Sequence, residues 1–600
     1  MIKLTFNPYN LEAELELHEQ SMIREIVKIS DVNSDIYRGS KNLAEIVIDI
    51  NDEPATIFVG FKDDYPGSLP LFFDLNNAFG RIPHKEKDGF ICFSRSEAIV
   101  IDRRYPVSLL LNCLEKVIDL IAKGISGENH EDYQLEFEAY WRHIAKGRVY
   151  GAIDTNDHNV REINLWCETS ESNFTIVASE KNIKGTKAII NTLFHIDIHQ
   201  EEKYRCIYIP LKQDTSILPP ANEEEWDYSV VKSIFTRHIT KKYKKQFQKL
   251  VKRKDNSVQK RLEFIVFGLP LSNGNTALFA YAMSGTGFDY LHPLVQKPKK
   301  VKLIPLKIER WHPNYLLNRT GGNTEVSNKH VAIVGVGSVG SEIAIRFAKS
   351  GIQHLTVIDN DILEMDNVYR HALGNDSVYA RNEDNQLINV PKVLALEKEI
   401  KRKYPFIQVT SIAKSFADLW QDSSINWKDY DLLVVAIGSA NQEMDINEKM
   451  HSMKQSPPTI YAWNEPLGVG GHSLITLNNE KKGCYQCLFK PMEGKTVHNR
   501  SSFTKPNQDF SKDLTGCGSI YVPYSFLDSE KTAMLVVENS LKLLTGKLQD
   551  NPLLSWKGDD NQLKREGFAT SHRYSFGEQE LINTQLLYKD QECPVCTMKG

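Results

Sequence analysis

Residues 330–351 read HVAIVGVGSVGSEIAIRFAKSG. An apolar run typical of a buried strand leads into a glycine-rich turn, and apolar residues at helical spacing follow the turn. Gly335, Gly337 and Gly340 form the pattern G-x-G-x-x-G, which permits a tight turn and a close approach of the backbone to phosphate. The free N–H groups at the start of the helix favour an anion. The stretch predicts a nucleotide-binding unit of a kind that NAD-, FAD- and ATP-binding proteins share.

The segments that follow continue the alternation of strand and helix. The runs HLTVIDN (354–360) and YDLLVVAIG (430–438) predict strands, and residues 390–405 between them predict a helix. This alternation predicts a parallel sheet with right-handed crossovers, as in a Rossmann-like α/β fold. Asp359 ends the second strand 19 positions after Gly340, where a ribose-binding carboxylate belongs.

A second polar cluster discriminates between the cofactors. A nucleoside triphosphate needs cations over its phosphates, for which Arg370 and Lys392 are suited. It also needs a carboxylate for Mg²⁺, for which Asp361 is the candidate, and Asn367 can donate to a phosphate oxygen. A nicotinamide enzyme has no need of this cluster, so the pattern favours ATP with Mg²⁺.

The polar cluster also resembles a family signature. Residues 359–370 match the D-x-D-x(5)-N-x-x-R pattern of the ubiquitin-activating and ThiF/MoeB adenylating superfamily, and Lys392 resembles that family's lysine at the start of the next helix. The resemblance implies a C-terminal ThiF/MoeB adenylation domain over residues 321–600, with ATP and Mg²⁺ as ligands.

Two features of that family lack a single counterpart here. The family has an aspartate after the strand at 430–438, where this chain offers Gly438, Ser439 and Asn441. The metal shell could then be completed by ATP phosphates and water, or by one of the carboxylates Asp361, Glu443 and Asp445. The family also has an upstream arginine over the phosphates, and both candidates stay open: Arg310 and Arg319.

Two C-x-x-C pairs predict a metal site. Cys484 and Cys487 form the first pair, and Cys593 and Cys596 form the second. Four thiolates at this spacing suit a closed, tetrahedral, structural Zn²⁺ site. Such a site would hold the C-terminal tail against the adenylation domain, and MoeB-like proteins have a similar arrangement.

Cys517 is the first candidate nucleophile. It lies in the glycine-flanked run TGCGSIYVP (515–523), between the two C-x-x-C pairs. A cysteine without large neighbours can be approached by an acyl-adenylate, and its thiolate would be the nucleophile. The run resembles the catalytic-cysteine loop of ubiquitin-activating enzymes, which implies that Cys517 forms a thioester.

Cys92 is the second candidate nucleophile. The run YPGSLP (65–70) and the run HKEKDGFIC (84–92) resemble the Y-P-x-x-P and H-x(n)-G-x-I-C patterns of ubiquitin-conjugating enzymes. The resemblance implies an α+β conjugating domain over residues 1–145, in which Cys92 carries the acyl group. The family's H-P-N motif is His84-Lys-Glu here, so the asparagine that stabilises the aminolysis oxyanion is missing. Hydrogen bonding that orients the loop is as good an interpretation of His84 as acid–base work.

Helical patterns and the middle of the chain complete the predicted organisation. Residues 11–27 predict a helix, and residues 106–124 predict a second one that begins at Pro106 and ends at Gly124. Residues 146–320 mix strands with a basic run at 236–254 and predict a mixed α/β linker domain without a catalytic pattern. We interpret the basic run as a solvated helix face.

Composition limits the class of protein. The 600 residues include 77 acidic and 73 basic side chains, a balance that does not favour a nucleic-acid binder. Neither a signal peptide nor the ~18 apolar residues of a membrane span is seen. We therefore expect a cytoplasmic protein with no nucleic-acid or membrane partner. Three further cysteines have apolar neighbours and predict core positions: Cys113, Cys167 and Cys206.

A conjugating, a linker and an activating domain in this order resemble the activating–conjugating fusion enzymes of bacterial CBASS anti-phage operons, and residues 461–472 also resemble that branch. The resemblance implies that the acyl donor is the C-terminus of a CD-NTase, a cyclic-nucleotide synthase, or of a ubiquitin-like protein. It further implies a lysine acceptor and a homodimer.

Three alternatives stay open at this point. A sulfur-carrier adenylyltransferase would share the nucleotide and zinc sites but would need no Cys92 domain. A nicotinamide-dependent oxidoreductase would share only the glycine turn, and a non-catalytic scaffold would need neither Cys92 nor Cys517.

Overall fold

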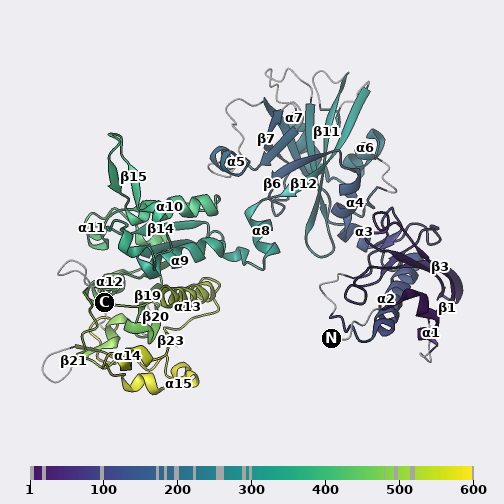
Figure 1. The fold of residues 1–600 in the computed structure, drawn as a ribbon. Coiled ribbons are helices and arrows are strands. Elements are labelled where there is room, and N and C mark those ends of the chain that lie inside the picture. The colour runs from purple at the N-terminus through teal and green to yellow at the C-terminus, as the bar shows by residue number, and fades with distance from the viewer. Residues whose placement is uncertain are drawn as a thin grey trace. The chain divides into compact units, whose positions relative to one another are not determined.

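The structure is a computed structural model (Figure 1). It divides into two compact units, Met1–Asn182 with Asp197–Arg310, and Ile183–Ile196 with Trp311–Gly600. The residues that it describes are 6–16, 22–94, 100–169, 174–181, 186–194, 202–220, 225–251, 262–286, 292–295, 300–478, 480, 482–491, 497–513 and 521–597.

The first unit begins with a five-stranded antiparallel meander. Its strands are β1 (Ile23–Asp31), β2 (Asn42–Ile50), β3 (Glu53–Phe61), β4 (Leu71–Phe73) and β5 (Phe90–Ile91). Helix α2 (Pro106–Ser126) buries its apolar face in the same core as β2 and β3. The sheet and this helix give the α+β domain that the sequence predicts.

Both helix predictions for this domain need correction. Helix α1 (Leu11–Leu15) is short, and β1 begins at Ile23, because residues 23–31 pair with β2 in an antiparallel ladder that outweighs the local helical pattern. Helix α2 continues past Gly124, which packs against Ile82, and ends at Gly127 with a left-handed backbone (φ 81°).

The rest of the first unit is a closed barrel, which the sequence did not predict. The strand order is β10-β11-β12-β6-β8-β7-β9. The bounds are β6 (Gly147–Ala152), β7 (Arg161–Thr169), β8 (Phe174–Ser179), β9 (Glu202–Pro210), β10 (Leu262–Pro270), β11 (Thr276–Thr286) and β12 (Lys300–Arg310). Alternate residues of β9 face opposite sides, since Cys206 and Tyr208 lie in the interior core while Ile207 and Ile209 face the outer helices.

Helices pack on one side of the barrel. They are α4 (Phe137–Ile144), α6 (Tyr228–Arg237) and α7 (Lys241–Val251), and the short helix α3 (Asp132–Leu135) precedes α4 in the chain. Helix α7 is the basic run, and it buries Phe247 and Val251 while Lys241, Lys245 and Lys249 are exposed. The described part of this run is therefore a solvated basic face, as expected.

The second unit contains a seven-stranded sheet in the order β17-β14-β13-β18-β19-β20-β23. Its strands are β13 (His330–Val334), β14 (His354–Ile358), β17 (Gln408–Ile412), β18 (Leu432–Val435), β19 (Thr459–Asn464), β20 (Gly470–Thr476) and β23 (Leu553–Lys557). The first five are parallel to one another, β20 pairs antiparallel with β19, and β23 pairs antiparallel with β20. The predicted Rossmann-like arrangement is confirmed, with β13 at the point where the strand order reverses.

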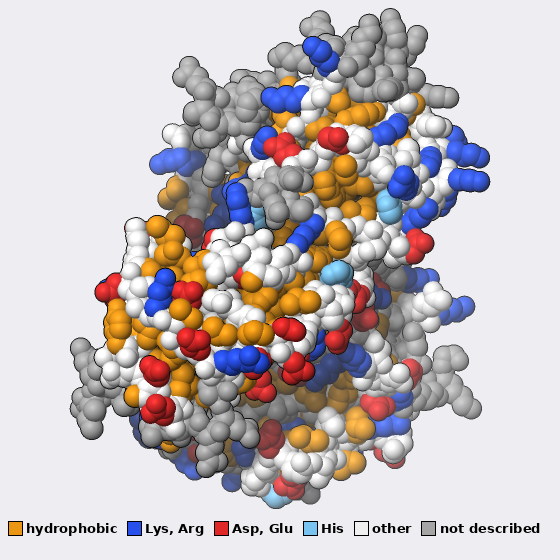
Figure 2. All heavy atoms as spheres, turned by 90° about the vertical axis from the view of Figure 1, so that its right-hand side faces the viewer, with side chains coloured by type: hydrophobic (Ala, Val, Ile, Leu, Met, Phe, Trp, Pro, Cys, Tyr) orange, Lys and Arg blue, Asp and Glu red, His pale blue; other side chains and the backbone are white. Residues whose placement is uncertain are grey.

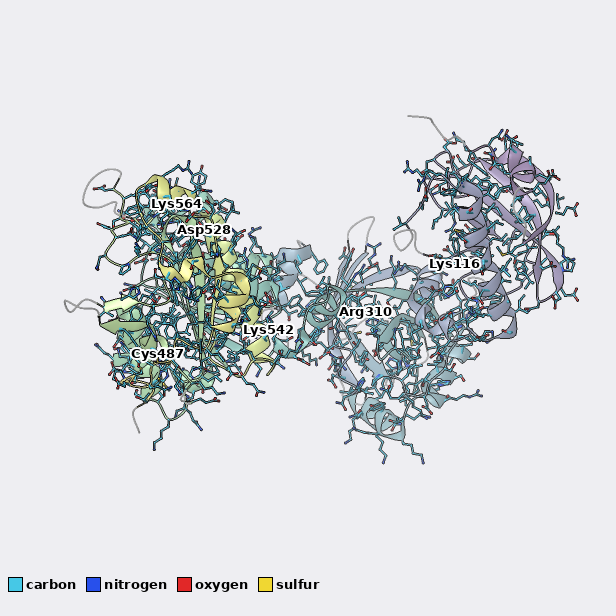
Figure 3. The ribbon with its side chains drawn as sticks, turned by 90° about the horizontal axis from the view of Figure 1, so that it is seen from below. Lys116, Arg310, Cys487, Asp528, Lys542 and Lys564 are labelled. Carbon is cyan, nitrogen blue, oxygen red and sulfur yellow. The ribbon has the colours of Figure 1, made fainter. Side chains whose placement is uncertain are left out.

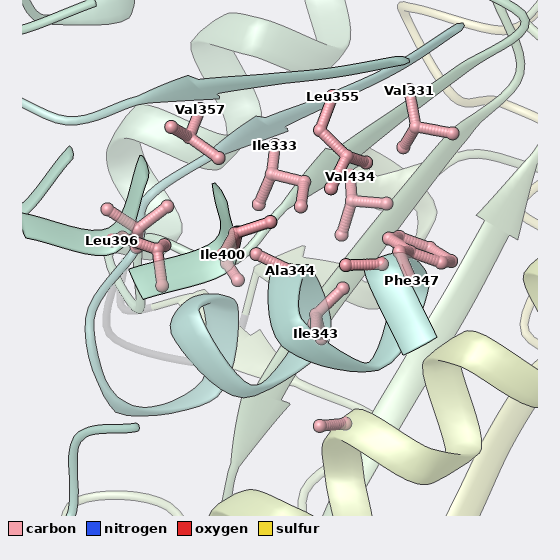
Figure 4. Close-up of a cluster of buried hydrophobic side chains, with 14 of the residues drawn as sticks. Val331, Ile333, Ile343, Ala344, Phe347, Leu355, Val357, Leu396, Ile400 and Val434 are labelled. Carbon is pink, nitrogen blue, oxygen red and sulfur yellow. The ribbon is translucent and has the colours of Figure 1, made fainter. Parts of the chain in front are cut away.

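Helices cover both faces of this sheet. On one face α9 (Ser338–Lys349), α10 (Lys392–Lys403) and α13 (Phe526–Leu544) pack over the cluster drawn in Figure 4, which includes Ile333, Phe347 and Leu396. On the other face lie α11 (Phe416–Gln421) and α12 (Ala440–Ser452). The core on this side includes Ile446 and Met450 of α12 and four buried cysteines.

Short elements complete the chain: α5 (Thr186–Phe194), α8 (Pro313–Arg319), β15 (Tyr379–Arg381), β16 (Leu387–Asn389), β21 (Phe489–Pro491), β22 (Val497–Asn499), α14 (Asn561–Arg565) and α15 (Glu578–Asn583). None of the helices in the described ranges is long and apolar enough to span a bilayer. On the face drawn in Figure 2, acidic and basic side chains are interspersed, in keeping with the near-balanced composition.

Candidate active site

The glycine turn connects β13 to α9 and contacts the ends of the neighbouring strands β14 and β18. Gly335 has a left-handed backbone (φ 84°), and its N–H donates to the Ile358 carbonyl at 2.9 Å. A Cβ on Gly335 would lie 2.7 Å from the Ala436 carbonyl oxygen, and one on Gly340 would lie 1.8 Å from the Gly335 oxygen. A Cβ on Gly337 would meet no described atom within 4 Å. The fold thus requires the first and third glycines, whereas the second faces space that a phosphate could occupy.

Asp359 and His371 fix the peptide at Val336 within this turn. The Asp359 carboxylate accepts from the Val336 N–H at 2.7 Å and from the Asp361 N–H at 2.8 Å. The His371 Nε2 lies 2.8 Å from the Val336 carbonyl oxygen, and burial lowers the pKa of His371 to about 4, so the ring is neutral. His371 was not a sequence candidate, although it directly follows the arginine of the signature.

Asp361 and Lys392 form an ion pair beside the turn. The Lys392 Nζ lies 2.8 Å from the Asp361 Oδ2, and the Lys392 N–H donates to the Asp361 carbonyl at 3.0 Å. Lys392 is nearly buried at the start of α10, whereas the Asp361 side chain is largely exposed. The pair brings the candidate Mg²⁺ ligand and a candidate phosphate ligand together. Asn367 lies nearby in sequence, and its Oδ1 accepts from the Glu364 N–H at 3.2 Å.

Arg370 and the glycine turn both contact Tyr524. The Tyr524 hydroxyl lies 2.7 Å from the Ser338 hydroxyl, and the Arg370 guanidinium lies 5.2 Å from the centroid of the Tyr524 ring. Tyr524 was not a sequence candidate, because its proximity to the turn arises from residues almost two hundred positions apart. The only local signal was its place just after the run that contains Cys517.

The alternative carboxylates for the metal are arranged differently. Glu443 is buried, and its two oxygens accept from the Gly438 N–H at 3.0 Å and from the Tyr485 hydroxyl at 2.5 Å. Asp445 pairs with Lys449 at 2.7 Å on the exposed side of α12. Of the three carboxylates, Asp361 is the one that contacts Asp359 and Lys392 next to the turn, so it stays our candidate for Mg²⁺. Ser439 occupies the N-cap position of α12 without a side-chain capping hydrogen bond, and Asn441 lies in the first turn of the helix.

The two upstream arginines belong to different units. Arg310 ends β12 in the first unit, where it pairs with Glu138 and donates to the Thr276 carbonyl at 2.5 Å. Arg319 ends α8 in the unit that contains the glycine turn. Since Arg310 is already engaged in the barrel, Arg319 is the better candidate to reach the phosphates.

The two C-x-x-C pairs come together as the sequence predicts. Their four sulfur atoms lie within 4.8 Å of one another, with separations of 3.9, 3.6 and 3.5 Å for the pairs 484–487, 484–593 and 487–596. Four thiolates at about 2.3 Å from a tetrahedral zinc would be about 3.8 Å apart. The cluster, of which Cys487 is labelled in Figure 3, therefore fits Zn²⁺.

Cys517 lies outside the described residues, but the segments on both sides of it are described. Lys512 and Tyr521 exchange backbone hydrogen bonds of 2.9 and 3.0 Å. The Pro523 carbonyl accepts from the Leu467 N–H at 2.6 Å. The ends of the segment that contains Cys517 are therefore attached to the second unit.

Cys92 is exposed directly after β5, and the His84 backbone holds it. The Cys92 N–H donates to the His84 carbonyl at 2.9 Å. The His84 ring lies between two carboxylates of α3 and the turn before α4, with Nε2 3.1 Å from Asp132 and Nδ1 3.0 Å from Glu136. The hydrogen bond with Glu136, with help from Asp132, raises the pKa of His84 despite partial burial. This geometry favours an orienting role for His84.

The remaining cysteines of the first unit are core residues. Cys113 lies on the buried face of α2, and Cys167 and Cys206 line the barrel interior. Burial raises the pKa of the Cys113 thiol to about 11. The core positions that the sequence predicts for these three residues are confirmed.

Two family models match the chain in the order that the sequence predicts. Residues 20–149 match prokaryotic E2 family B, and residues 314–557 match the ThiF family. The "ATP-dependent ubiquitin transferase-like protein Cap2" of Pseudomonas aeruginosa is 24% identical over 78% of this chain and 80% of its own length. The chain joins a prokaryotic E2 domain to a ThiF domain, a fusion similar to the Cap2 proteins. The fusion is thus an enzyme of the ubiquitin-activating and ubiquitin-conjugating class.

Other relatives match smaller parts of the fusion. The Cap2 protein of Escherichia coli is 26% identical over 46% of this chain and 42% of its own length. The crystal structure of E. coli MccB with SeMet MccA covers 46% of this chain and 68% of that chain at 17% identity, with a TM-score of 0.31.

Proposed function

We propose that the fusion adenylates the C-terminus of a partner protein, carries it first on Cys517 and then on Cys92, and transfers it to a lysine. The observation that carries this proposal is that the glycine turn, Asp359, Arg370 and the Asp361–Lys392 pair come together at the carboxyl ends of the parallel strands β13 and β14. The same chain presents an exposed cysteine in an E2-type domain.

In the first step, a carboxylate oxygen of the partner's C-terminus attacks the α-phosphorus of ATP. The bond to the β-phosphate breaks, and pyrophosphate leaves with Mg²⁺. The glycine turn and the start of α9 would bind phosphate oxygens, and Asp359 the ribose. Lys392, Arg370, Arg319 and Asn367 would neutralise or orient the phosphates, with Mg²⁺ on Asp361.

In the later steps, thiolates replace one leaving group after another. The Cys517 thiolate attacks the acyl carbon and AMP leaves, so that a thioester forms. The Cys92 thiolate then attacks the same carbon, and the Cys517 thiolate leaves. A lysine amine finally attacks the acyl carbon of the Cys92 thioester, the Cys92 thiolate leaves, and the nitrogen loses a proton, so that an amide forms. A reducing, cytoplasmic setting is part of this proposal, since these thiols must escape oxidation.

The zinc site has a structural role in this scheme. Cys484, Cys487, Cys593 and Cys596 would hold a closed Zn²⁺ that supplies no reactant and ties the C-terminal tail to the sheet. We also propose, from the resemblance to CBASS fusions, that the acyl donor is the C-terminus of a CD-NTase. Homodimerisation through the second unit is part of the proposal, and the exposed apolar side chains of Phe526, Leu527 and Met534 on α13 support it.

The alternatives predict different roles for the thiols. A sulfur-carrier adenylyltransferase has no use for the E2-type domain, whereas a scaffold has no use for either nucleophile. A nicotinamide enzyme has no use for the Asp361–Lys392 and Arg370 cluster. The match to both family models and the ion pair at the turn therefore favour conjugation.

The test is thioester capture with the CD-NTase from the same operon as the donor. We expect ATP-dependent, reductant-sensitive adducts on both cysteines, and no adduct on Cys92 in Cys517→Ala. Cys517→Ala should keep ATP–pyrophosphate exchange, and Cys92→Ala should still form the Cys517 thioester but no conjugate. Cys92→Lys should trap the donor as an amide that mass spectrometry identifies. Unchanged conjugation in either alanine variant would refute the thiol relay.

A further inference from the structure

Glu443 lies between the nucleotide turn and the cysteine cluster. It is on α12, five residues after Gly438, and only 1% of it is exposed. One carboxylate oxygen accepts from the Gly438 N–H at 3.0 Å, and the other accepts from the Tyr485 hydroxyl at 2.5 Å. A buried carboxylate with two such partners holds both of them in place, because loss of either one leaves an unsatisfied buried group.

The first partner belongs to the segment that supports the glycine turn. This segment follows β18, and the Ala436 N–H donates to the Val334 carbonyl at 2.8 Å. A Cβ on Gly335 would lie 2.7 Å from the Ala436 oxygen and 2.8 Å from the Ile437 nitrogen, so these backbones are already in close contact. A shift of Gly438 would therefore be felt at the first glycine of the turn.

The second partner, Tyr485, lies inside the first C-x-x-C motif of the four-cysteine cluster, residues 484–487, which we call the knuckle. Tyr485 stands between Cys484 and Cys487, and its N–H donates to the Asn447 Oδ1 at 3.2 Å. The Asn447 Nδ2 lies 3.5 Å from the Cys484 sulfur. Glu443 and Asn447 are four residues apart on α12 and thus share the face turned toward the knuckle.

We propose that Glu443 is a positioning residue that couples the four-cysteine site to the nucleotide turn through Tyr485 and Gly438. An ordered knuckle holds the Tyr485 hydroxyl on Glu443, and Glu443 in turn holds the backbone that supports Gly335. The proposed nucleotide site would then have its full affinity only while the knuckle is ordered. This inference rests on the proposed function, since it concerns the same ATP site.

The test uses Tyr485→Phe, which removes one hydroxyl, and Glu443→Gln, with Asp445→Asn as the matched control. Asp445 is an exposed acid on the same helix, and its partner is the half-buried Lys449. Binding of AMPPNP with Mg²⁺ is measured by calorimetry, zinc content by mass spectrometry, and backbone exchange of residues 435–440 by hydrogen–deuterium exchange. Each variant is measured as prepared and after dialysis against a chelator.

We expect Tyr485→Phe and Glu443→Gln to keep one zinc per chain but to bind AMPPNP about three- to tenfold more weakly, with faster exchange at 435–440. Asp445→Asn should match the wild type. Chelation should weaken AMPPNP binding in the wild type and change it little in Tyr485→Phe, because the link is already broken. A thermal melt on each variant shows whether it is folded, and Tyr485→Phe carries the test if Glu443→Gln is not.

Two results would overturn the coupling. One is wild-type affinity in both Tyr485→Phe and Glu443→Gln. The other is an equal loss of affinity on chelation in the wild type and in Tyr485→Phe. A wild-type enzyme that binds no AMPPNP would instead overturn the nucleotide site itself, and this inference with it.

Discussion

The hydroxyl groups of Tyr524 and Ser338 lie 2.7 Å apart, which joins the segment after Cys517 to the first turn of α9. Tyr524 follows Cys517 by seven positions in the sequence. The Arg370 guanidinium lies over the same tyrosine ring. Tyr524, which follows the run that contains Cys517, therefore contacts both Arg370 and the glycine turn.

Tyr524→Phe should separate thioester formation from adenylation. The variant keeps the ring under Arg370 but loses the hydroxyl bond to Ser338, a loss of roughly 1 kcal/mol. We expect ATP–pyrophosphate exchange within about twofold of wild type and single-turnover formation of the Cys517 thioester about fivefold slower. Ser338→Ala should give the same thioester defect, and the double variant should be no worse than either single one. Equal slowing of exchange and thioester formation would contradict this role.

Gly335→Ala should lower the stability of the second unit, whereas Gly337→Ala should lose nucleotide binding. At Gly335 the backbone is left-handed and a Cβ would meet the Ala436 oxygen at 2.7 Å, so we expect a loss of about 2 kcal/mol in the free energy of unfolding of the second unit. At Gly337 a Cβ meets no described atom within 4 Å, so stability should change by less than about 0.5 kcal/mol. AMPPNP binding should nevertheless be lost in Gly337→Ala. Denaturant unfolding and calorimetry check the pair, and normal AMPPNP binding by Gly337→Ala would argue against the phosphate position.

The contacts of His84 with Asp132 and Glu136 should stabilise the first unit most at low pH and less as pH rises. Because Glu136 and Asp132 raise the pKa of His84 above its unfolded value, the contribution is fully present below about pH 6.5. It is lost as pH rises through the raised folded pKa. The ring and both carboxylates are partly exposed, so we expect no more than about 1 kcal/mol.

The measurement for these contacts is the unfolding midpoint of the wild type and of Glu136→Gln between pH 5.5 and 9. The difference between the two should be largest at the acid end and shrink toward pH 9. Lys123 and Asp119 form an exposed pair elsewhere in the same unit, and Asp119→Asn serves as the control with no such pH trend. A difference that grows with pH would contradict the assignment.

Removal of zinc should loosen the second unit and spare the first. A structural zinc contributes several kcal/mol of folding free energy, so Cys593→Ser should lower the stability of the second unit by at least about 3 kcal/mol. Cys92→Ser is the matched control, since that cysteine is exposed and belongs to the other unit. Hydrogen–deuterium exchange resolved by segment checks both. Uniform loosening of the two units, or none, would speak against a structural metal at this cluster.

The local sequence pattern was sufficient to predict those elements and residues whose place is set by their neighbours in the sequence. The strand–turn–helix at 330–351, Asp359 at the end of the next strand, and the helix that begins with Lys392 all lie where the sequence predicts them. The pairing of the two C-x-x-C motifs was also predictable, because four thiols at metal-ligand spacing have few other uses in a reducing compartment.

Other features depended on partners that are distant in sequence. Residues 23–31 form a strand because β2 pairs with them, although their apolar spacing resembles a helix. The closed barrel arises from strand pairings that no local pattern encodes, such as the parallel pairing of β12 with β6. Glu443 is likewise a carboxylate near a predicted metal site in sequence, yet it faces Gly438 and Tyr485 in the structure.

The sequence by itself determined the chemistry of this protein: a glycine turn followed by carboxylates and cations, four paired thiols, and a cysteine in an E2-type run. These signals can be recognised in the sequence because each depends on backbone geometry or ligand spacing within a few residues. Only the tertiary structure decided which polar groups meet across the chain, namely His371 and Tyr524 at the turn, Glu443 at Tyr485, and His84 between Asp132 and Glu136. The physical reason is that a buried polar group takes whichever partner packing brings within about 3 Å, and that partner is fixed by the pairing of strands and helices far apart in the sequence.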